Sequence, residues 1–142
     1  MRPNQVEAAL TQGVDDVVAH PLVITPERKE KVAFTVHLES DVNQVIISGA
    51  KFGTVSSLED LGGKEIYTNP RTEPYQALQQ VNDRLPKTGK ALIVIEPDDK
   101  YLLEDDLVQM VNAGLLPATV TTASRARLWS EVVHHLTIHP SP

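Results

Sequence analysis

The chain has 142 residues, of which 41% are hydrophobic and 23% charged, a balance typical of one globular domain. Its net charge of −6 argues against nucleic acid or an anionic membrane as the main partner, because both attract an excess of Lys and Arg. The absence of cysteine excludes disulfides, thiolate metal sites and cysteine nucleophiles.

The amino-terminal residues do not resemble a secretory signal, because residues 1–6 lack an apolar stretch. No apolar run elsewhere has the length of a membrane span, so we expect no membrane insertion. The expected location is the cytoplasm for the chain as given, or the periplasm if the chain is a mature or excised fragment.

The first fifty residues predict two short helices and several strands. Residues 6–10 favour a short helix that ends at Gly13. Thr25 has the character of a helix cap, with Pro26 in the first turn after it. A short apolar strand is predicted at 14–19, and two strands joined by a polar turn at 33–38 and 42–48.

The next segment predicts a short helix with a defined start and end. Ser56 and Glu59 have the spacing of a capping box, in which each side chain bonds the backbone at the other residue. Gly62 and Gly63 would end this helix.

From residue 64 onward, predicted strands and helices alternate. Strands are expected at 64–68, 91–95, 118–121 and 136–139, and helices at 74–85, 104–112 and 124–133. The continuous apolar run 91–95 is typical of a central strand. This alternation predicts an α/β fold with a mainly parallel sheet between two layers of helices, a three-layer αβα arrangement. Ligands of such sheets lie at the carboxyl ends of the strands.

Several segments resemble the family-3 solute-binding proteins, whose fold is the type II periplasmic-binding-protein fold. The similar segments are 25–28 (TPER), 32–34 (VAF), 55–64 (VSSLEDLGGK) and 67–75. Residues 105–117, together with 127–129, resemble more narrowly the solute-binding module attached to membrane-bound lytic murein transglycosylases. The resemblance covers roughly residues 5 to 140.

This resemblance implies a partial, two-part organisation. Residues 1–50 would be the remnant of lobe one, and residues 51–142 a nearly complete lobe two. The chain contains no transglycosylase domain, so cell-wall cleavage is not expected of it.

The resemblance also implies ligand-binding residues. In the family, an Arg after the TPE turn binds the ligand carboxylate, and Arg28 matches it. A guanidinium group suits this role because it pairs with a carboxylate through two parallel hydrogen bonds. The alternative is that Arg28 is solvated or pairs locally with Glu27 or Glu30.

In the second lobe, the turn before the helix at 74–85 is a candidate anion site, because a helix N-terminus offers free N–H groups. Its candidate residues are Asn69, Arg71, Thr72 and Tyr75. Plain N-capping by Thr72 or Glu73 and packing of Tyr75 on Leu78 remain the alternatives.

Amino-acid-binding members of the family hold the ligand ammonium with an acidic residue after a late strand. The matching stretch, residues 121–124, contains Thr122 as a candidate ligand residue but no carboxylate. An unpaired buried ammonium would be costly, so we expect an anionic or neutral solute instead.

No pattern predicts catalysis, a metal or a cofactor. His134 and His135 are adjacent and would point to opposite faces of a strand, so with His139 they do not form an evident ligand set. No nucleophile elbow or paired acid and base is recognisable. Two hypotheses stay open: a non-catalytic small-molecule-binding module, and a degenerate module that forms homodimers and binds no small molecule.

Overall fold

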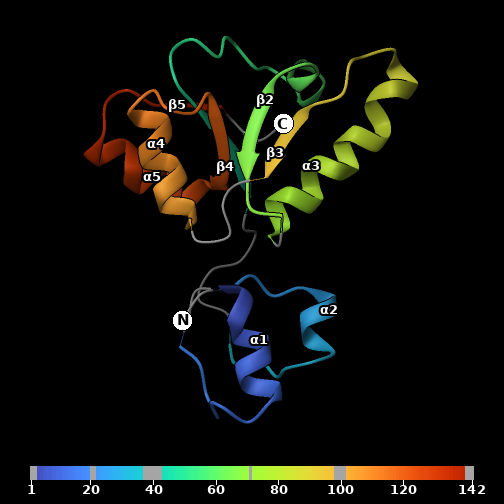
Figure 1. The fold of residues 1–142 in the computed structure, drawn as a ribbon, viewed down its shortest axis with the longest axis vertical. Helices are drawn as coiled ribbons and strands as arrows, with labels where there is room; N and C mark the ends of the chain where they lie inside the picture. Colours follow the sequence, from blue (N-terminus) through green and yellow to red (C-terminus); the bar gives the residue numbers. More distant parts are fainter. Residues whose placement is uncertain (1–2, 20–21, 37–42, 71, 98–101, 140–142) are drawn as a thin grey trace. The chain divides into compact units, whose positions relative to one another are not determined.

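The computed structural model describes residues 3–19, 22–36, 43–70, 72–97 and 102–139 (Figure 1). The chain divides into two compact units, Met1–Val42 and Asn43–Pro142. This division lies earlier in the chain than the boundary predicted at residue 50, so the stretch 43–50 belongs to the second unit.

The first unit contains two helices, α1 (Pro3–Thr11) and α2 (Pro26–Lys29), as the sequence predicted. Thr25 is the N-cap of α2, and its Oγ1 accepts a hydrogen bond of 3.3 Å from the Arg28 N–H. The predicted strand at 14–19 is wrong, and so is the described part, 33–36, of the strand predicted at 33–38. No strand is described in this unit with which either segment could pair, and isolated strands are not stable.

The second unit is built on one five-stranded sheet. Its strands are β1 (Gln44–Ser48), β2 (Glu65–Thr68), β3 (Val94–Pro97), β4 (Ala118–Thr122) and β5 (Thr137–His139), in the order β3-β2-β4-β1-β5 (Figure 1). β2 is parallel to β3 and β4, whereas β1 is antiparallel to β4 and β5. Every strand except β1 therefore runs in the same direction, and the mainly parallel sheet is confirmed.

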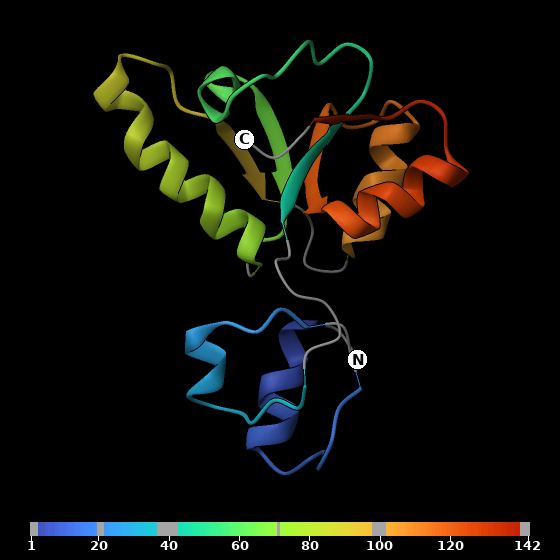
Figure 2. The ribbon, with the colours of Figure 1, turned by 180° about the vertical axis from the view of Figure 1, so that it is seen from behind.

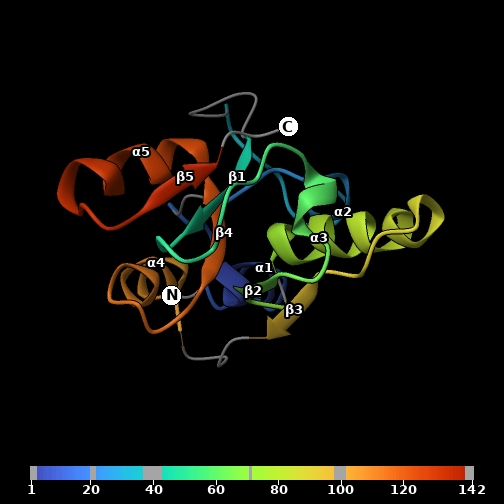
Figure 3. The same ribbon diagram turned by 90° about the horizontal axis from the view of Figure 1, so that it is seen from above.

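Helices cover both faces of this sheet. They are η1 (Leu58–Leu61), α3 (Glu73–Arg84), η2 (Leu85–Thr88), α4 (Glu104–Asn112) and α5 (Ala123–Val132). Figures 2 and 3 show α3 and η1 on one face and α4 and α5 on the other. Each face has its own apolar core, with Ile46 and Val120 on the α3 face and Val45 and Ile47 on the α4 face. The three-layer αβα arrangement is thus confirmed.

The position of the run 91–95 differs from the prediction. It was expected to form a central strand, but β3 begins at Val94 and lies at the edge of the sheet. Ile93, just before β3, forms its backbone hydrogen bonds with a side chain of α3 instead of with a neighbouring strand. Its N–H donates to Asn82 Oδ1 at 2.7 Å, and the Asn82 side-chain nitrogen donates to the Ile93 carbonyl oxygen at 3.0 Å. Apolar character alone does not distinguish this arrangement from a buried strand.

The predicted capping box is displaced by one residue. The short helix η1 is a 3-10 helix that follows Ser57, and Asp60 rather than Glu59 bonds back to its start. Asp60 Oδ2 accepts the N–H groups of Ser56 and Ser57, both at 3.0 Å. The predicted end at Gly62 holds, and a Cβ at Gly62 would lie only 2.6 Å from the Ala91 carbonyl oxygen.

The core predicts that two leucines contribute very differently to the stability of the fold. Leu107 is 1% exposed, whereas Leu115 is 69% exposed. We expect Leu107→Ala to lower the free energy of unfolding by about 2–5 kcal/mol, because it removes buried methyl groups and leaves a cavity. Urea denaturation followed by the fluorescence of Trp129, the sole tryptophan, measures this. The control Leu115→Ala should change stability by less than about 0.5 kcal/mol, and equal losses in the two variants would contradict the assigned core.

Candidate functional site

The carboxyl ends of β2 and β4 meet at one edge of the sheet. The strands are neighbours and parallel, and Tyr67 faces Thr119 across them. Asn69 directly follows β2, and Thr122 is the last residue of β4. The helices α3 and α5 begin just beyond these strands, so the N-termini of both helices lie at this carboxyl edge.

Hydrogen bonds fix the turn that leads into α3. Thr72 is the N-cap residue, but its Oγ1 donates to the Asn69 carbonyl oxygen at 2.7 Å instead of accepting a helix N–H. The Thr72 N–H donates to the same oxygen at 3.2 Å. In the first turn of the helix, the Tyr75 hydroxyl accepts a bond of 3.0 Å from the Gln79 side chain. Arg71, the remaining residue predicted for this turn, lies outside the described residues.

Thr122 caps the second helix at this edge. Its Oγ1 accepts the Arg125 N–H at 3.3 Å and lies 3.3 Å from the Ser124 hydroxyl. The fold therefore brings Asn69, Thr72 and Thr122 to one edge of the sheet, although they are far apart in the sequence. Their part in binding a ligand stays a prediction.

Arg28 belongs to the first unit and has local partners there. Its Nε donates to Glu7 Oε1 at 3.0 Å and its Nη1 to the Val23 carbonyl oxygen at 2.8 Å. The local ion pair is thus with Glu7, not with Glu27 or Glu30 as weighed from the sequence. Lys31 and Arg28 hold the pKa of the Glu7 carboxyl below its ordinary value, although burial acts in the opposite direction. A ligand role for Arg28 remains a prediction.

Glu104 is a feature of the carboxyl edge that the sequence analysis missed. It is the first residue of α4, and burial raises the pKa of its carboxyl above the ordinary value. Arg125 opposes this shift, with Nη1 lying 3.6 Å from Glu104 Oε2, whereas the nearby carboxylates of Glu73 and Asp105 reinforce it. The sequence places Glu104 in a helix start that is normally solvated, and the packing of α4 on the sheet leaves it half-buried.

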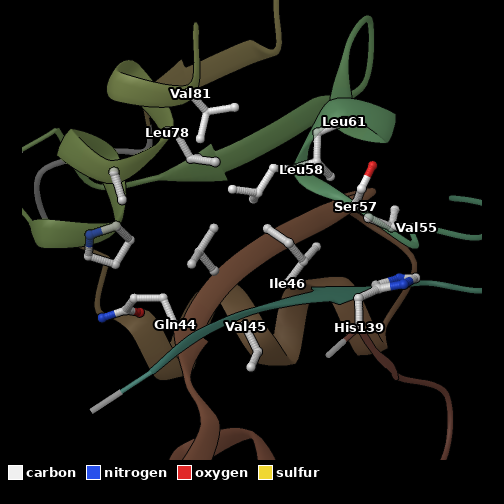
Figure 4. A pocket seen from close by; sticks show the side chains of 13 residues that line it. Gln44, Val45, Ile46, Val55, Ser57, Leu58, Leu61, Leu78, Val81 and His139 are labelled. Atoms are coloured by element: carbon white, nitrogen blue, oxygen red, sulfur yellow. The ribbon is translucent and has the colours of Figure 1, made fainter. Parts of the chain in front are cut away.

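The second unit also contains an apolar cavity of about 210 Å³ on its α3 face (Figure 4). Its walls come from β1, β4, β5, α3 and the segment around η1. The lining residues are Gln44, Val45, Ile46, Val55, Ser57, Leu58, Leu61, Pro74, Ala77, Leu78, Val81, Val120 and His139. No motif marks this cavity in the sequence, because its residues come from separate elements.

His139, considered as a metal ligand from the sequence, is buried at the end of β5. Its Nε2 lies 2.7 Å from Ser48 Oγ, and burial lowers the pKa of the imidazole. His134 and His135 are exposed. Within the described ranges, no three His, Asp or Glu side chains gather in a way that could hold a metal ion. No helix in those ranges combines the length and apolar character needed to cross a bilayer.

Comparison with solved structures identifies the fold. The chain superimposes on an ancestral arginine-binding protein bound to arginine with a TM-score of 0.74 and 23% identity, over 98% of this chain and 58% of that one. The fold is that of a type II periplasmic solute-binding protein. A structure from work on glutathione import in Streptococcus mutans gives a TM-score of 0.77 at 13% identity, over 100% of this chain and 57% of that one.

A further similar structure is an ancestral amino acid-binding protein described as a precursor of cyclohexadienyl dehydratase, with a TM-score of 0.71 and 25% identity. That match covers 97% of this chain and 56% of the other. The chain therefore spans little more than half the length of the proteins it resembles. No protein-family model and no curated protein sequence matches it.

The half-buried Glu104 predicts a pH dependence of stability. Because its folded pKa is raised, the folded state holds the proton more tightly than the unfolded state does. The ionised Glu104 carboxylate therefore lowers the free energy of unfolding. This loss is absent below the unfolded pKa of about 4.3 and is complete above the raised folded pKa. We expect the wild type to lose stability relative to Glu104→Gln as the pH rises through this interval.

Urea denaturation at a series of pH values measures this difference. The exposed Glu131→Gln on α5 provides the control and should follow the wild type at every pH. If the free energies of unfolding of the wild type and Glu104→Gln changed with pH in the same way, the Glu104 carboxyl would not be desolvated.

Proposed function

We propose that this chain is a non-catalytic module that binds a small solute at the carboxyl edge of β2 and β4. The observation that carries the proposal is the convergence of Asn69, Thr72 and Thr122 at the N-termini of α3 and α5. Backbone N–H groups and hydroxyls at such an edge are suited to holding the polar groups of a ligand. The type II fold and its solute-binding structural neighbours support the same role.

The charges at this edge favour a solute with no net charge. Anionic and neutral solutes both agree with the sequence, but Glu104 and Glu73 lie close enough to influence one another. The carboxylates of Glu104 and Asp105 would repel an anion, and Arg125 lies beside both, with Nη1 3.6 Å from Glu104 Oε2 and 3.5 Å from Asp105 Oδ2. A neutral solute or a zwitterion fits this balance better than an anion does.

Amino acids, which the sequence alone disfavoured as ligands, are therefore candidate solutes. The stretch 121–124 has no carboxylate for a ligand ammonium, but the Glu104 carboxylate comes near Thr121 from a different element. We propose that Glu104 supplies the missing negative charge. Two of the structural neighbours are ancestral proteins bound to arginine and to glutamine. Of these, glutamine has no net charge and is the better candidate here.

A carboxylate on such a solute would need a cation or a helix N-terminus as its partner. Arg28 and Arg71 remain the cations proposed from the family resemblance. Within the first unit, the Arg28 Nε is paired with Glu7 Oε1 at 3.0 Å.

The narrower resemblance of residues 105–117 to the module of lytic murein transglycosylases adds a second solute class. We propose peptidoglycan fragments as alternative ligands on that basis, with a periplasmic location for the module. Muropeptides carry amino-acid groups, so the same carboxyl edge would serve them.

A thermal-shift screen followed by calorimetric titration tests the proposal. We expect glutamine or a muropeptide to raise the melting temperature, since ligand at about 100 times its Kd stabilises by about 2.7 kcal/mol. Thr122→Val should weaken the affinity about tenfold by removing one ligand hydrogen bond. Thr137→Val, on the short edge strand β5, is the matched control and should bind normally. No stabilisation by glutamine, arginine, glutathione or a muropeptide would refute the proposal.

Homodimerisation is the second candidate function, and exposed apolar residues on α5 favour it. Leu128 and Val132 lie one turn apart and are 64% and 70% exposed. Adjacent apolar side chains on one helix face are suited to packing on a second copy.

Light scattering tests this candidate. A dimer would have twice the chain mass of 15.6 kDa, and replacing Leu128 and Val132 together by Lys should produce the monomer. Charged residues would be desolvated in the interface, which is unfavourable. A wild-type monomer at every concentration would exclude homodimerisation.

A further inference from the structure

The apolar cavity contains a buried polar atom with no partner. Gln44 is the first residue of β1, and its Oε1 is buried without a hydrogen-bond partner among the described residues. Leaving such an acceptor unpaired is unfavourable, because it has lost its hydrogen bonds to water without replacement. A ligand that donates a hydrogen bond to Oε1 would remove this cost.

The remaining walls are mostly apolar. Figure 4 shows Leu78 and Val81 from α3, Leu58 and Leu61 from η1, and Ile46 from β1 around the cavity. The volume of about 210 Å³ exceeds that of an engineered cavity of about 150 Å³ that binds benzene. A molecule with one or two fused rings would therefore find room and lose its apolar surface from water.

Among the described residues that line the cavity, none has a permanently charged side chain. At the end away from Gln44, His139 and Ser57 are its polar residues (Figure 4). His139 is hydrogen-bonded to Ser48, and the lowered pKa of its imidazole favours the neutral form. An ionic ligand would lose its hydration here without gaining a countercharge, so the lining selects an uncharged one.

We propose that this cavity binds a small, uncharged, largely apolar molecule that carries one N–H or O–H donor. The donor bonds Gln44 Oε1, and the rings pack on Ile46, Leu78 and Val81. The site is separate from the carboxyl-edge site, because none of Asn69, Thr72, Tyr75 and Thr122 lines it. It therefore takes a different class of ligand from the solute proposed above.

Indole and 1-methylindole are the probes that test this site. They have the same fused rings, but only indole has an N–H donor. In titrations followed by the methyl NMR signals of the protein, we expect indole to shift Ile46, Leu78 and Val120 saturably. It should bind about tenfold more tightly than 1-methylindole, the difference for one additional net hydrogen bond of about 1.4 kcal/mol.

Two variants separate the donor contact from the cavity itself. Gln44→Leu should bring the affinity for indole down to that for 1-methylindole, whereas Gln80→Leu, on the exposed surface of α3, should leave it unchanged. Ala77→Leu adds a side chain at the exposed rim of the cavity and should abolish binding without unfolding the chain. Thr122→Val should leave indole binding intact, so failure of the carboxyl-edge proposal is distinguishable from failure of this one.

Equal affinities for the two probes would overturn the assigned contact with Gln44. Absence of saturable shifts with either probe, in a wild type whose Trp129 fluorescence reports a folded chain, would overturn the site. Occupation of the cavity by a second copy of the chain would appear as concentration-dependent shifts of the same methyl signals without any probe, and this too would contradict the proposal.

Discussion

The parallel contact between β2 and β4 is the constraint on which the second unit depends. Tyr67 faces Thr119 there, and the fully buried Thr119 hydroxyl donates to the Tyr67 carbonyl oxygen at 2.9 Å. This contact joins the β3-β2 pair to the β4-β1-β5 group. It sets the carboxyl ends of β2 and β4 side by side, and with them the N-termini of α3 and α5. Without this register, the predicted residues Asn69 and Thr122 would not share an edge.

Much of the fold could be predicted because its signals are local. The helix at 104–112 was predicted with its observed bounds, since acidic residues favour a first turn and Gly114 a helix end. The strand at 91–95 was misplaced because the difference between an edge and a centre depends on which strands pair. Residues 14–19 contain four apolar residues around Asp15 and Asp16, but a strand forms only with a partner. Local sequence patterns therefore predicted the type of each element better than they predicted which elements lie next to one another in the sheet.

The same distinction applies to the candidate site. Asn69, Thr72 and Thr122 could be predicted from the alternation of strands and helices, since each lies where a strand meets a helix. Glu104 and Gln44 could not, because their surroundings come from elements distant in the sequence: the sheet against which α4 packs for Glu104, and α3 beside the cavity for Gln44. β1 connects the two sites, since Gln44 pairs with Thr122 at the polar edge and also lines the apolar cavity. The raised pKa of Glu104 has a counterpart at many functional sites, where partly desolvated acids are common.

The central claim is that one solute contacts the ends of both β2 and β4. Backbone amide NMR of the whole chain, titrated with glutamine, tests it most directly. The account predicts that the amide signals of Thr72 and Ala123 shift together, with the same midpoint, because both lie at the edge that the β2-β4 contact creates. Shifts confined to one of these segments, or clustered elsewhere in the unit, would contradict it.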